Sequence, residues 1–361
     1  MKGDCDDLCL EPVGAGLGSR AHHLLGLVCP NSALGDWGSS SAAPTTAISG
    51  FGVRVPPFTN FEVNSGTGAP RVTVASGKDL RQRLAGPLPA SDPEVLDILR
   101  TDFLDPPSNL PYNFTSNFLV EGQHSFTWPW IFNHLKEIFS EQRDGFFVEA
   151  GALDGVYLSN TLWLEMSLGW RGLLIEPDKD SYKALRSKHR KSWTSNTCLS
   201  SEPFPKKIIM VSHSADRQLI QKSYWWVYRG HSHELRKDHV VILDNDSPVD
   251  KTYSQVQCFP LLSYLLALNV STVDLLSLDV QGTEVLILDS LLKSNSISVR
   301  VIVAEDEIGT FDHTHMERMG YTLVATGLDH IYVKKGDEIL ARNNIKERIA
   351  KLKVDQKRPE R

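Results

Sequence analysis

The sequence lacks a long hydrophobic run and an excess of basic residues. None of its 361 residues lie in an uninterrupted apolar stretch of about 18, so the sequence shows no membrane-spanning helix. The formal net charge is -6. A nucleic-acid surface needs a basic face to bind phosphates, so nucleic acid is not an expected partner.

Cysteine is scarce and odd in number. Of the five cysteines, Cys5 and Cys9 have zinc-like spacing, but no second ligand pair follows them, so no metal is predicted there. Cys198 and Cys258 lie in the part of the chain that is expected to fold. They would pair in a secretory lumen and would remain buried thiols in a cytosol. The sequence leaves this choice open.

Proline and glycine are concentrated at the N-terminus. Twelve of the 19 prolines precede residue 112, and 13 of the 25 glycines precede residue 87. This density breaks helices and strands, so residues 1–110 are expected to be a low-complexity, mostly disordered region. A short helix at 92–104, with Ser91 as its N-cap, is expected within it. Residues 111–335 are expected to form the folded domain, and 336–361 a charged C-terminal helix or tail.

Beyond residue 129, segments with helical and strand periodicity alternate. Helices are expected at 131–139, 158–168, 180–189, 261–268 and 284–292. Strands are expected at 146–150, 172–176, 195–199, 207–212, 240–243, 273–279, 299–305, 321–325 and 330–334. This alternation predicts an α/β fold with a mainly parallel sheet and helices on both faces. The last two strands read as an antiparallel hairpin, which makes the sheet mixed.

A glycine turn follows the first predicted strand, in Phe146-Phe-Val-Glu-Ala-Gly-Ala-Leu-Asp-Gly155. Ligands bind beyond the carboxyl ends of parallel strands, and Gly151 would let the backbone approach one closely. The carboxylate of Glu149 disfavours a phosphate and favours an ammonium group. S-adenosylmethionine carries an ammonium and a sulfonium and no phosphate. The turn also lacks Gly-x-Gly-x-x-Gly, so a dinucleotide is disfavoured.

A second acid, Glu176, ends the next predicted strand. A carboxylate at that position can accept hydrogen bonds from both ribose hydroxyls of a nucleoside. Each acid also has a structural interpretation: Glu149 as a helix cap or ion-pair residue, and Glu176 as a residue fixed beside Pro177.

These segments together resemble the FkbM-type methyltransferases. The resemblance covers roughly residues 125–335 and is carried by 147–155, by Leu158-Ser-Asn-Thr-Leu-Trp-Leu-Glu165, by Gly169-Trp-Arg-Gly-Leu-Leu-Ile-Glu-Pro177 and by Leu276-Ser-Leu-Asp-Val-Gln-Gly-Thr-Glu284. It implies a Rossmann-like, mixed seven-stranded sheet of the class I methyltransferase type. It also implies S-adenosylmethionine as cofactor, and methyl transfer to oxygen on a small-molecule or glycan-type acceptor.

The resemblance and the strand ends together name the candidate site. The expected cofactor-binding residues are Glu149, Gly151, Asp154, Gly155, Ser159, Asn160 and Glu176. Ser159 and Asn160 would cap a helix, either with its first amides facing the cleft or in a purely structural role.

Asp279 and Glu284 are the expected catalytic residues. Asp279 would take a proton from a hydroxyl acceptor or, together with Glu284, bind a divalent cation. The family motif reads Asp-Val-Glu-Gly-x-Glu, and this chain has Gln281 in place of the middle glutamate. The missing negative charge weakens the case for a metal, and no metal is predicted.

One alternative remains open. The wording of 276–284, the aromatic insertion Tyr224-Trp-Trp-Val-Tyr228 and the stretch Asn196-Thr-Cys-Leu-Ser200 are similar to an animal Star-like branch of the family. This likeness implies a non-catalytic regulator of growth-factor ligand export with membrane-protein cargo. Its location would be the endoplasmic reticulum, Golgi, endosomes or plasma membrane, and the alternative location is the cytoplasm. His231 and His233, beside the insertion, would bind a metal, lie on a substrate-facing loop or pack on the surface.

Overall fold

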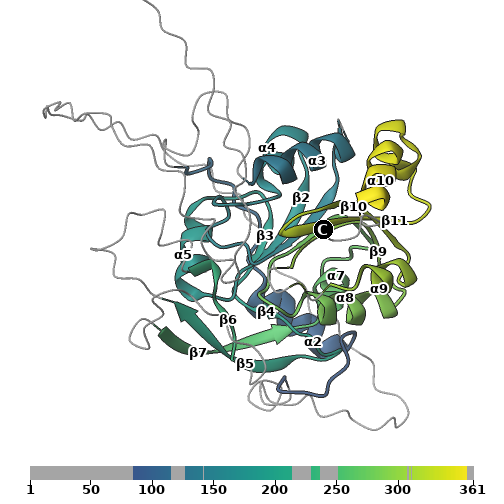
Figure 1. Ribbon diagram of the computed structural model, residues 1–361. Helices are drawn as coiled ribbons and strands as arrows, with labels where there is room; N and C mark the ends of the chain where they lie inside the picture. Colours follow the sequence, from purple (N-terminus) through teal and green to yellow (C-terminus); the bar gives the residue numbers. More distant parts are fainter. Residues whose placement is uncertain are drawn as a thin grey trace, which may run out of the picture. The chain divides into compact units, whose positions relative to one another are not determined.

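The computed structural model describes residues 84–114, 127–140, 142–213, 229–235, 251–306, 309 and 311–355 (Figure 1). All of these residues belong to one compact unit. Every helix within these ranges falls short of the length and apolar character needed to cross a bilayer. The strand expected at 240–243 and residues 1–83 of the expected N-terminal region lie outside the described residues.

A seven-stranded mixed sheet forms the centre, with the strand order β10–β11–β9–β8–β1–β2–β3. Its strands are β1 (Phe146–Ala150), β2 (Arg171–Ile175), β3 (Trp193–Ser195), β8 (Thr272–Leu278), β9 (Ser298–Glu305), β10 (Tyr321–Thr326) and β11 (Asp329–Lys334). Within this sheet, neighbouring strands are parallel from β9 through β8, β1 and β2 to β3. Strand β11 is antiparallel to both β9 and β10. The predicted α/β class, the mixed sheet and its terminal hairpin are confirmed.

Helices cover both faces of this sheet, because successive strand residues point to opposite sides. Phe147 packs in one apolar cluster and Val148 in the other. The cluster of Phe147 includes α3 (Pro129–Phe139), α4 (Leu162–Leu168), α5 (Lys179–Ser187) and α10 (Asn343–Asp355). The cluster of Val148 includes α2 (Pro93–Ile98), α7 (Leu261–Ala267), α8 (Glu284–Lys293) and α9 (His313–Arg318). The result is a three-layer arrangement with the core on both sides of the sheet.

A second, four-stranded sheet departs from the sequence expectation. It has the order β4–β7–β5–β6 and consists of β4 (Cys198–Leu199), β7 (Lys251–Phe259), β5 (Lys206–His213) and β6 (His233–Glu234). The strand expected at 195–199 is therefore divided between the two sheets, and the one expected at 207–212 lies outside the central sheet. Strand β7 escaped prediction because residues 252–255 are polar or exposed and carry no apolar alternation.

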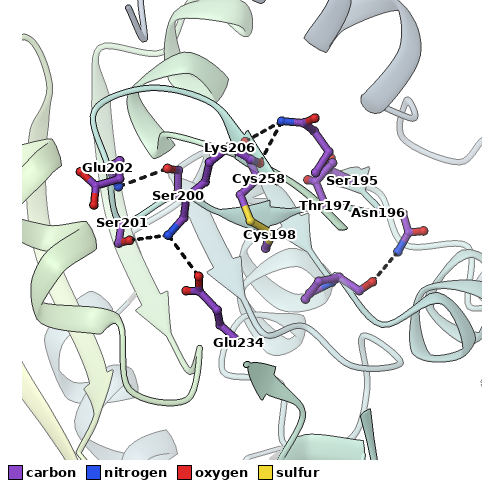
Figure 2. The surroundings of a disulfide bond; sticks show 12 residues. Ser195, Asn196, Thr197, Cys198, Ser200, Ser201, Glu202, Lys206, Glu234 and Cys258 are labelled. Carbon is purple, nitrogen blue, oxygen red and sulfur yellow. Dashed lines mark hydrogen bonds and ion pairs between the residues drawn. A yellow bond between two sulfur atoms is a disulfide. The ribbon is translucent and has the colours of Figure 1, made fainter. Parts of the chain in front are cut away.

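A disulfide between Cys198 and Cys258 joins β4 to β7 within this second sheet (Figure 2). The two cysteines are direct partners in the parallel pairing of the strands. Lys206 lies close by and contacts Glu234 at 3.3 Å, which links β5 to β6. The choice left open by the sequence is thus settled in favour of the pair.

The expectation that the chain before residue 110 is mostly disordered is wrong for residues 84–110. Residues 84–110 do not fall in a poorly packed segment, since Leu84, Val95 and Leu99 are fully buried in the cluster that covers the central sheet. The expected helix is α2 followed by a π-helix, η2 (Leu99–Phe103). Asp92, and not Ser91, caps it by accepting a hydrogen bond from the Glu94 backbone N–H.

Two helix boundaries are also corrected. The helix expected at 158–168 begins only at Leu162, because the preceding residues form a loop in which Leu158 has a positive φ of 55°. It ends at Gly169 in a left-handed conformation, as a C-terminal glycine commonly does. The C-terminal helix α10 is more than a solvated tail, since Ile345 is fully buried against the core.

Candidate functional site

A pocket lies at the carboxyl ends of three neighbouring strands of the central sheet. Gly151 follows β1, Glu176 follows β2 and Asp279 follows β8, and all three line it. The opposite wall comes from the second sheet and from residues 229–234. Its lining includes Cys198, Leu199, Ile208, Met210, Arg229, His233 and Glu234.

Gly151 occupies a position that only glycine can fill. Its φ is +84°, and a Cβ on it would lie 1.9 Å from the carbonyl oxygen of Asp279. The surrounding backbone is fixed by hydrogen bonds: Gly151 N–H donates to Ile175 O at 3.0 Å, and Asp279 N–H donates to Ala150 O at 3.0 Å. The missing side chain therefore lets the first turn pack directly on the end of β8.

Glu176 is a buried carboxyl group at the edge of this pocket. Its Oε2 accepts a hydrogen bond from Leu153 N–H at 2.7 Å, and its Oε1 accepts one from Asp178 N–H at 2.7 Å. Burial, with smaller contributions from the charges of Asp178 and Asp279, raises the pKa of Glu176 to about 8. Each carboxyl oxygen has two lone pairs, so each keeps capacity for a second donor.

Glu149 is not among the residues that line the pocket. Its buried carboxylate accepts hydrogen bonds from Ser159 Oγ at 2.8 Å, from Asn160 N–H at 2.8 Å and from Thr161 Oγ1 at 2.6 Å. Burial raises its pKa, while the nearby Arg190 guanidinium opposes the rise. This geometry corresponds to the structural interpretation that the sequence left open, because Glu149 fixes the loop that begins α4.

The same loop holds the other expected residues that follow β1. They are Asp154, Gly155, Ser159 and Asn160. None of the four lines the pocket. Asp154 accepts hydrogen bonds from the backbone N–H groups of Val156 and Tyr157, and Ser159 Oγ accepts one from Leu162 N–H. Of the seven residues expected to bind the cofactor, Gly151 and Glu176 thus lie in the pocket; four others lie in the loop after β1, and Glu149 holds that loop from within β1.

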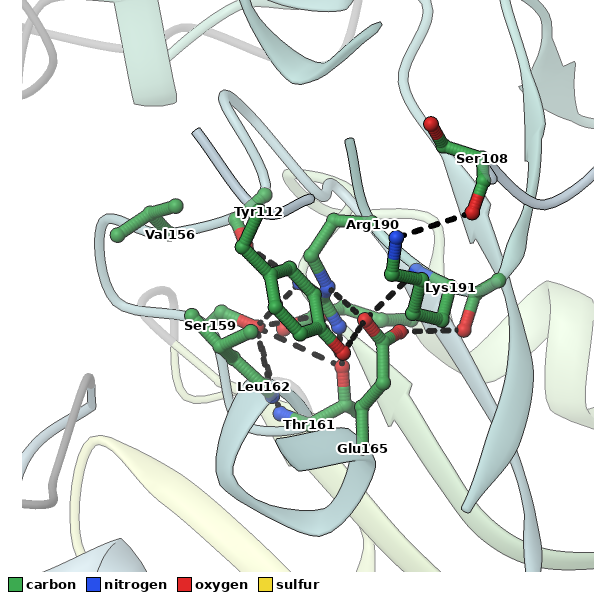
Figure 3. Close-up of polar contacts among 12 residues, drawn as sticks. Ser108, Tyr112, Val156, Ser159, Thr161, Leu162, Glu165, Arg190 and Lys191 are labelled. Carbon is green, nitrogen blue, oxygen red and sulfur yellow. Dashed lines mark hydrogen bonds and ion pairs between the residues drawn. The ribbon is translucent and has the colours of Figure 1, made fainter. Parts of the chain in front are cut away.

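The sequence analysis missed the cation that organises this loop, which is Arg190 (Figure 3). Arg190 is 2% exposed, and its Nε donates to Glu165 Oε1 at 3.1 Å. Its two terminal nitrogens donate to Gly155 O and to Thr161 Oγ1. Burial of Glu165 is outweighed by Arg190 and by further donors, so the pKa of Glu165 falls below its ordinary value. Arg190 stands between His189 and Lys191 in a basic stretch, so its residue type alone gave no signal for this role.

Asp279 lies in the pocket, but its expected partner Glu284 does not. Glu284 is turned back on its own turn, where Oε1 accepts from Val280 N–H at 2.8 Å and Oε2 from Gly282 N–H at 2.9 Å. Burial raises its pKa to about 7. The expectation that Asp279 and Glu284 could bind a cation together is therefore corrected, because both carboxyl oxygens of Glu284 accept backbone donors of its own turn. No group of three or more His, Cys, Asp or Glu side chains within the described ranges could hold a metal ion.

Gln281 contacts two acids at the ends of adjacent strands. Its Nε2 donates to Asp279 Oδ1 at 3.0 Å and to Glu305 Oε2 at 2.8 Å. The substitution relative to the family motif thus contacts Asp279, the lining residue that was expected to be catalytic, although Gln281 itself does not line the pocket.

The opposite wall of the pocket holds residues that the sequence indicated only weakly. His233 lines the pocket, and its Nδ1 lies 3.0 Å from His231 O. Arg229 pairs with Asp178 at 2.8 Å and with Asp180 at 2.9 Å. Alternating histidines beside the aromatic insertion were the one sequence signal for this wall.

The structure is that of an α/β protein with a pocket at the carboxyl edge of its central sheet. Residues 149–326 match the family of the methyltransferase FkbM domain. The matched segment runs from the end of β1 to the end of β10 and contains Gly151, Glu176 and Asp279. No curated protein matches the chain. The matched segment covers about half of the chain, and nothing in these comparisons supports the Star-like branch.

Proposed function

We propose that the chain is an S-adenosylmethionine-dependent methyltransferase of the FkbM type. The observation that carries the proposal is the convergence of Gly151, Glu176 and Asp279 on one pocket inside the matched segment. The strand order, with β1 between β2 and β8 and an antiparallel β11, supports a Rossmann-like sheet of the class I type.

The pocket residues suit this cofactor better than a dinucleotide. S-adenosylmethionine would supply a methyl group on a sulfonium that is already a good leaving group. Gly151 lets the turn after β1 pack directly on the backbone of Asp279, where a Cβ would clash, and this holds both strand ends at the pocket. Glu176 has lone pairs left for two ribose hydroxyls. Because Glu149 does not reach the pocket, Asp279 is the acid of the three strand ends that would face a cationic ligand, and the buried Glu176 serves as a hydrogen-bonding group.

Asp279 is our candidate for the proton acceptor in methyl transfer to oxygen. Its side chain is exposed and lines the pocket, and only its Oδ1 accepts a hydrogen bond among the described residues. Oδ2 can therefore accept the proton of a hydroxyl acceptor. The remaining task of the protein is to align that hydroxyl with the methyl group and to exclude water. A small-molecule or glycan-type acceptor is proposed.

Calorimetry with S-adenosylhomocysteine and the full-length chain tests cofactor binding. We expect one binding event in the wild type, strong weakening in Glu176→Ala, and no change in Glu317→Ala, which removes an exposed carboxylate on α9. Ligand at 100 times its dissociation constant should add about 2.7 kcal/mol to the free energy of unfolding. Absence of heat at millimolar ligand, with an unchanged melting temperature, would refute the proposal.

The disulfide favours an oxidising compartment, because such bonds persist in secreted and luminal proteins and are rare in the cytosol. We propose that the domain works in the secretory pathway. This is also the single observation that favours the Star-like alternative with its membrane-protein cargo. A non-reducing peptide map of the chain purified from its own cells should show Cys198 joined to Cys258, and two free thiols there would contradict a luminal location. Binding of S-adenosylhomocysteine then separates a methyltransferase from a trafficking regulator without a cofactor.

A further inference from the structure

We infer that Gln281 is a positioning residue whose side-chain amide bridges Asp279 and Glu305 and takes the place that a divalent cation would otherwise need. The inference deepens the proposed function and rests on it, because it concerns how the reactive end of the same pocket is held together.

The two carboxylates are brought together by strand pairing. Asp279 directly follows β8 and Glu305 is the last residue of β9, and these strands are parallel neighbours with Leu278 opposite Ala304. Two like charges at adjacent strand ends repel each other, which disfavours their joint ionisation. Donors placed between the two carboxyl groups would offset this repulsion.

The amide of Gln281 has the chemistry to do so. A carboxamide nitrogen carries two N–H donors, and an ionised carboxylate only accepts. The distances of 3.0 Å to Asp279 Oδ1 and 2.8 Å to Glu305 Oε2 use both donors, which also fixes which end of the amide faces the acids. Gln281 is 9% exposed, whereas Asp279 is exposed to the pocket. The bridge thus holds one oxygen of Asp279 from behind and leaves the other toward a ligand.

The backbone around Gln281 is held in an unusual conformation that aims this side chain. Its φ is +59°, a left-handed value that is rare outside glycine, and Gly282 follows with a φ of +97°. Glu284 secures the turn by accepting hydrogen bonds from the backbone N–H groups of Val280 and Gly282. A strained residue supported in this way points to a function for its side chain. It also assigns Glu284 a role, since Glu284 stabilises the turn that presents Gln281.

The neighbouring carboxyl groups favour an amide over another carboxylate at position 281. Asp329 begins β11 and pairs with Glu305 across the antiparallel ladder, so another carboxyl group already lies at this edge. A glutamate at position 281, as in the family motif, would add a further negative charge to Asp279 and Glu305. Such an oxygen-rich set would favour a hard divalent cation. With an amide in its place, we expect the pocket of this chain to work without one.

Mn²⁺ binding to the full-length chain tests the inference, with the paramagnetic resonance spectrum of the ion and calorimetry as readouts. Gln281→Glu supplies the third carboxylate, and the matched control Gln255→Glu adds the same charge at an exposed position on β7. We expect Gln281→Glu to bind Mn²⁺ at least tenfold more tightly than wild type and control, with a melting temperature that rises on Mn²⁺ addition. S-adenosylhomocysteine affinity of the wild type should not change on addition of a chelator.

Two results would overturn the inference. One is Mn²⁺ binding in Gln281→Glu that is no tighter than in Gln255→Glu. The other is tight Mn²⁺ binding to the wild type that disappears in Asp279→Asn, a measurement that does not depend on the folding of Gln281→Glu. If the wild type fails to bind S-adenosylhomocysteine while the Mn²⁺ pattern is as expected, the methyltransferase proposal fails and the bridge stands.

Discussion

At the scale of single residues, Gly151 combines two constraints that can be separated by substitution. Its φ of +84° is shared by Gly336, but a Cβ on Gly336 would meet nothing within 4 Å. Gly336→Ala should therefore cost only the backbone strain, about 1 kcal/mol. Gly151→Ala should cost several times more, because its Cβ would overlap the carbonyl of Asp279. Denaturant unfolding of both variants measures the difference, and equal losses would show that the turn can move away from β8.

Asp329 provides a test of pH dependence. Burial and the charge of Asp279 raise its pKa to about 7, above an ordinary value near 4. The folded state therefore keeps a proton that the unfolded chain has lost, and this group makes stability fall as the pH rises from about 4 to about 7. Asp329→Asn should remove that slope, and its unfolding free energy at pH 8 should exceed the wild-type value by on the order of 1 kcal/mol.

The control for Asp329→Asn is Asp97→Asn, whose side chain is 80% exposed beside Arg100. It should leave the shape of the wild-type pH profile unchanged, because surface ion pairs contribute little. His134 and His313, whose pKa values are lowered by burial, make stability rise with pH near 6.5 in all three proteins, so they cancel in the comparison. If the pH profile of Asp329→Asn runs parallel to that of the wild type, the raised pKa of Asp329 is contradicted.

Residue identities in the sequence located the pocket but did not show where each side chain points. Gly151, Glu176 and Asp279 stand at strand ends, and strand ends can be predicted from apolar runs alone. Glu149 and Glu284 carry equally good motif signals, yet each points into a local loop and accepts backbone donors there. Local capping and pocket lining use the same residue types, so the sequence could not separate them.

At the scale of elements, the disulfide joins the short strand β4 to β7 across a sequence separation of 60. Closing a loop of this length restricts the unfolded chain by about 4 kcal/mol in the chain-entropy account. Since β4 has only two residues, the second sheet should lose much of its order when the bond is absent. We expect a reductant to lower the melting temperature of the wild type, and Cys198→Ala with Cys258→Ala to be equally low with and without reductant. Alkylation of the free thiols verifies that the wild type is reduced. An unchanged melting temperature of that reduced protein would refute this expectation.

The two sheets differ in how far they could be predicted. All seven strands of the central sheet were located within one or two residues except β3, because buried parallel strands appear as short apolar runs between helices. The second sheet is solvent-exposed along much of β7 and pairs β5 with β7 across a gap of about forty residues in the chain. Its pairing depends on contacts between distant segments, and periodicity does not report them.

At the scale of the whole molecule, the sequence misjudged where the folded part begins. Proline-rich composition suggested little structure before residue 110, yet Asp105 pairs with Thr194 beside β3, and the Arg100 side chain donates to Ala267 O at the end of α7. Prolines at 87, 89 and 93 precede or begin α2 and do not interrupt it. The boundary of 110 cuts through packed structure, and the lower limit of the folded part lies at or before residue 84.

Two leucines of this stretch give a matched test of that conclusion. Leu99 is fully buried in the core cluster that includes α7, while Leu110 is 57% exposed. Leu99→Ala should lower the free energy of unfolding of the full-length chain by about 3 kcal/mol, because it removes apolar contacts and leaves a cavity. Leu110→Ala should change it by less than about 0.5 kcal/mol. Urea unfolding followed by tryptophan fluorescence measures both. Equally small losses of unfolding free energy would show that residues 84–110 contribute little to the core.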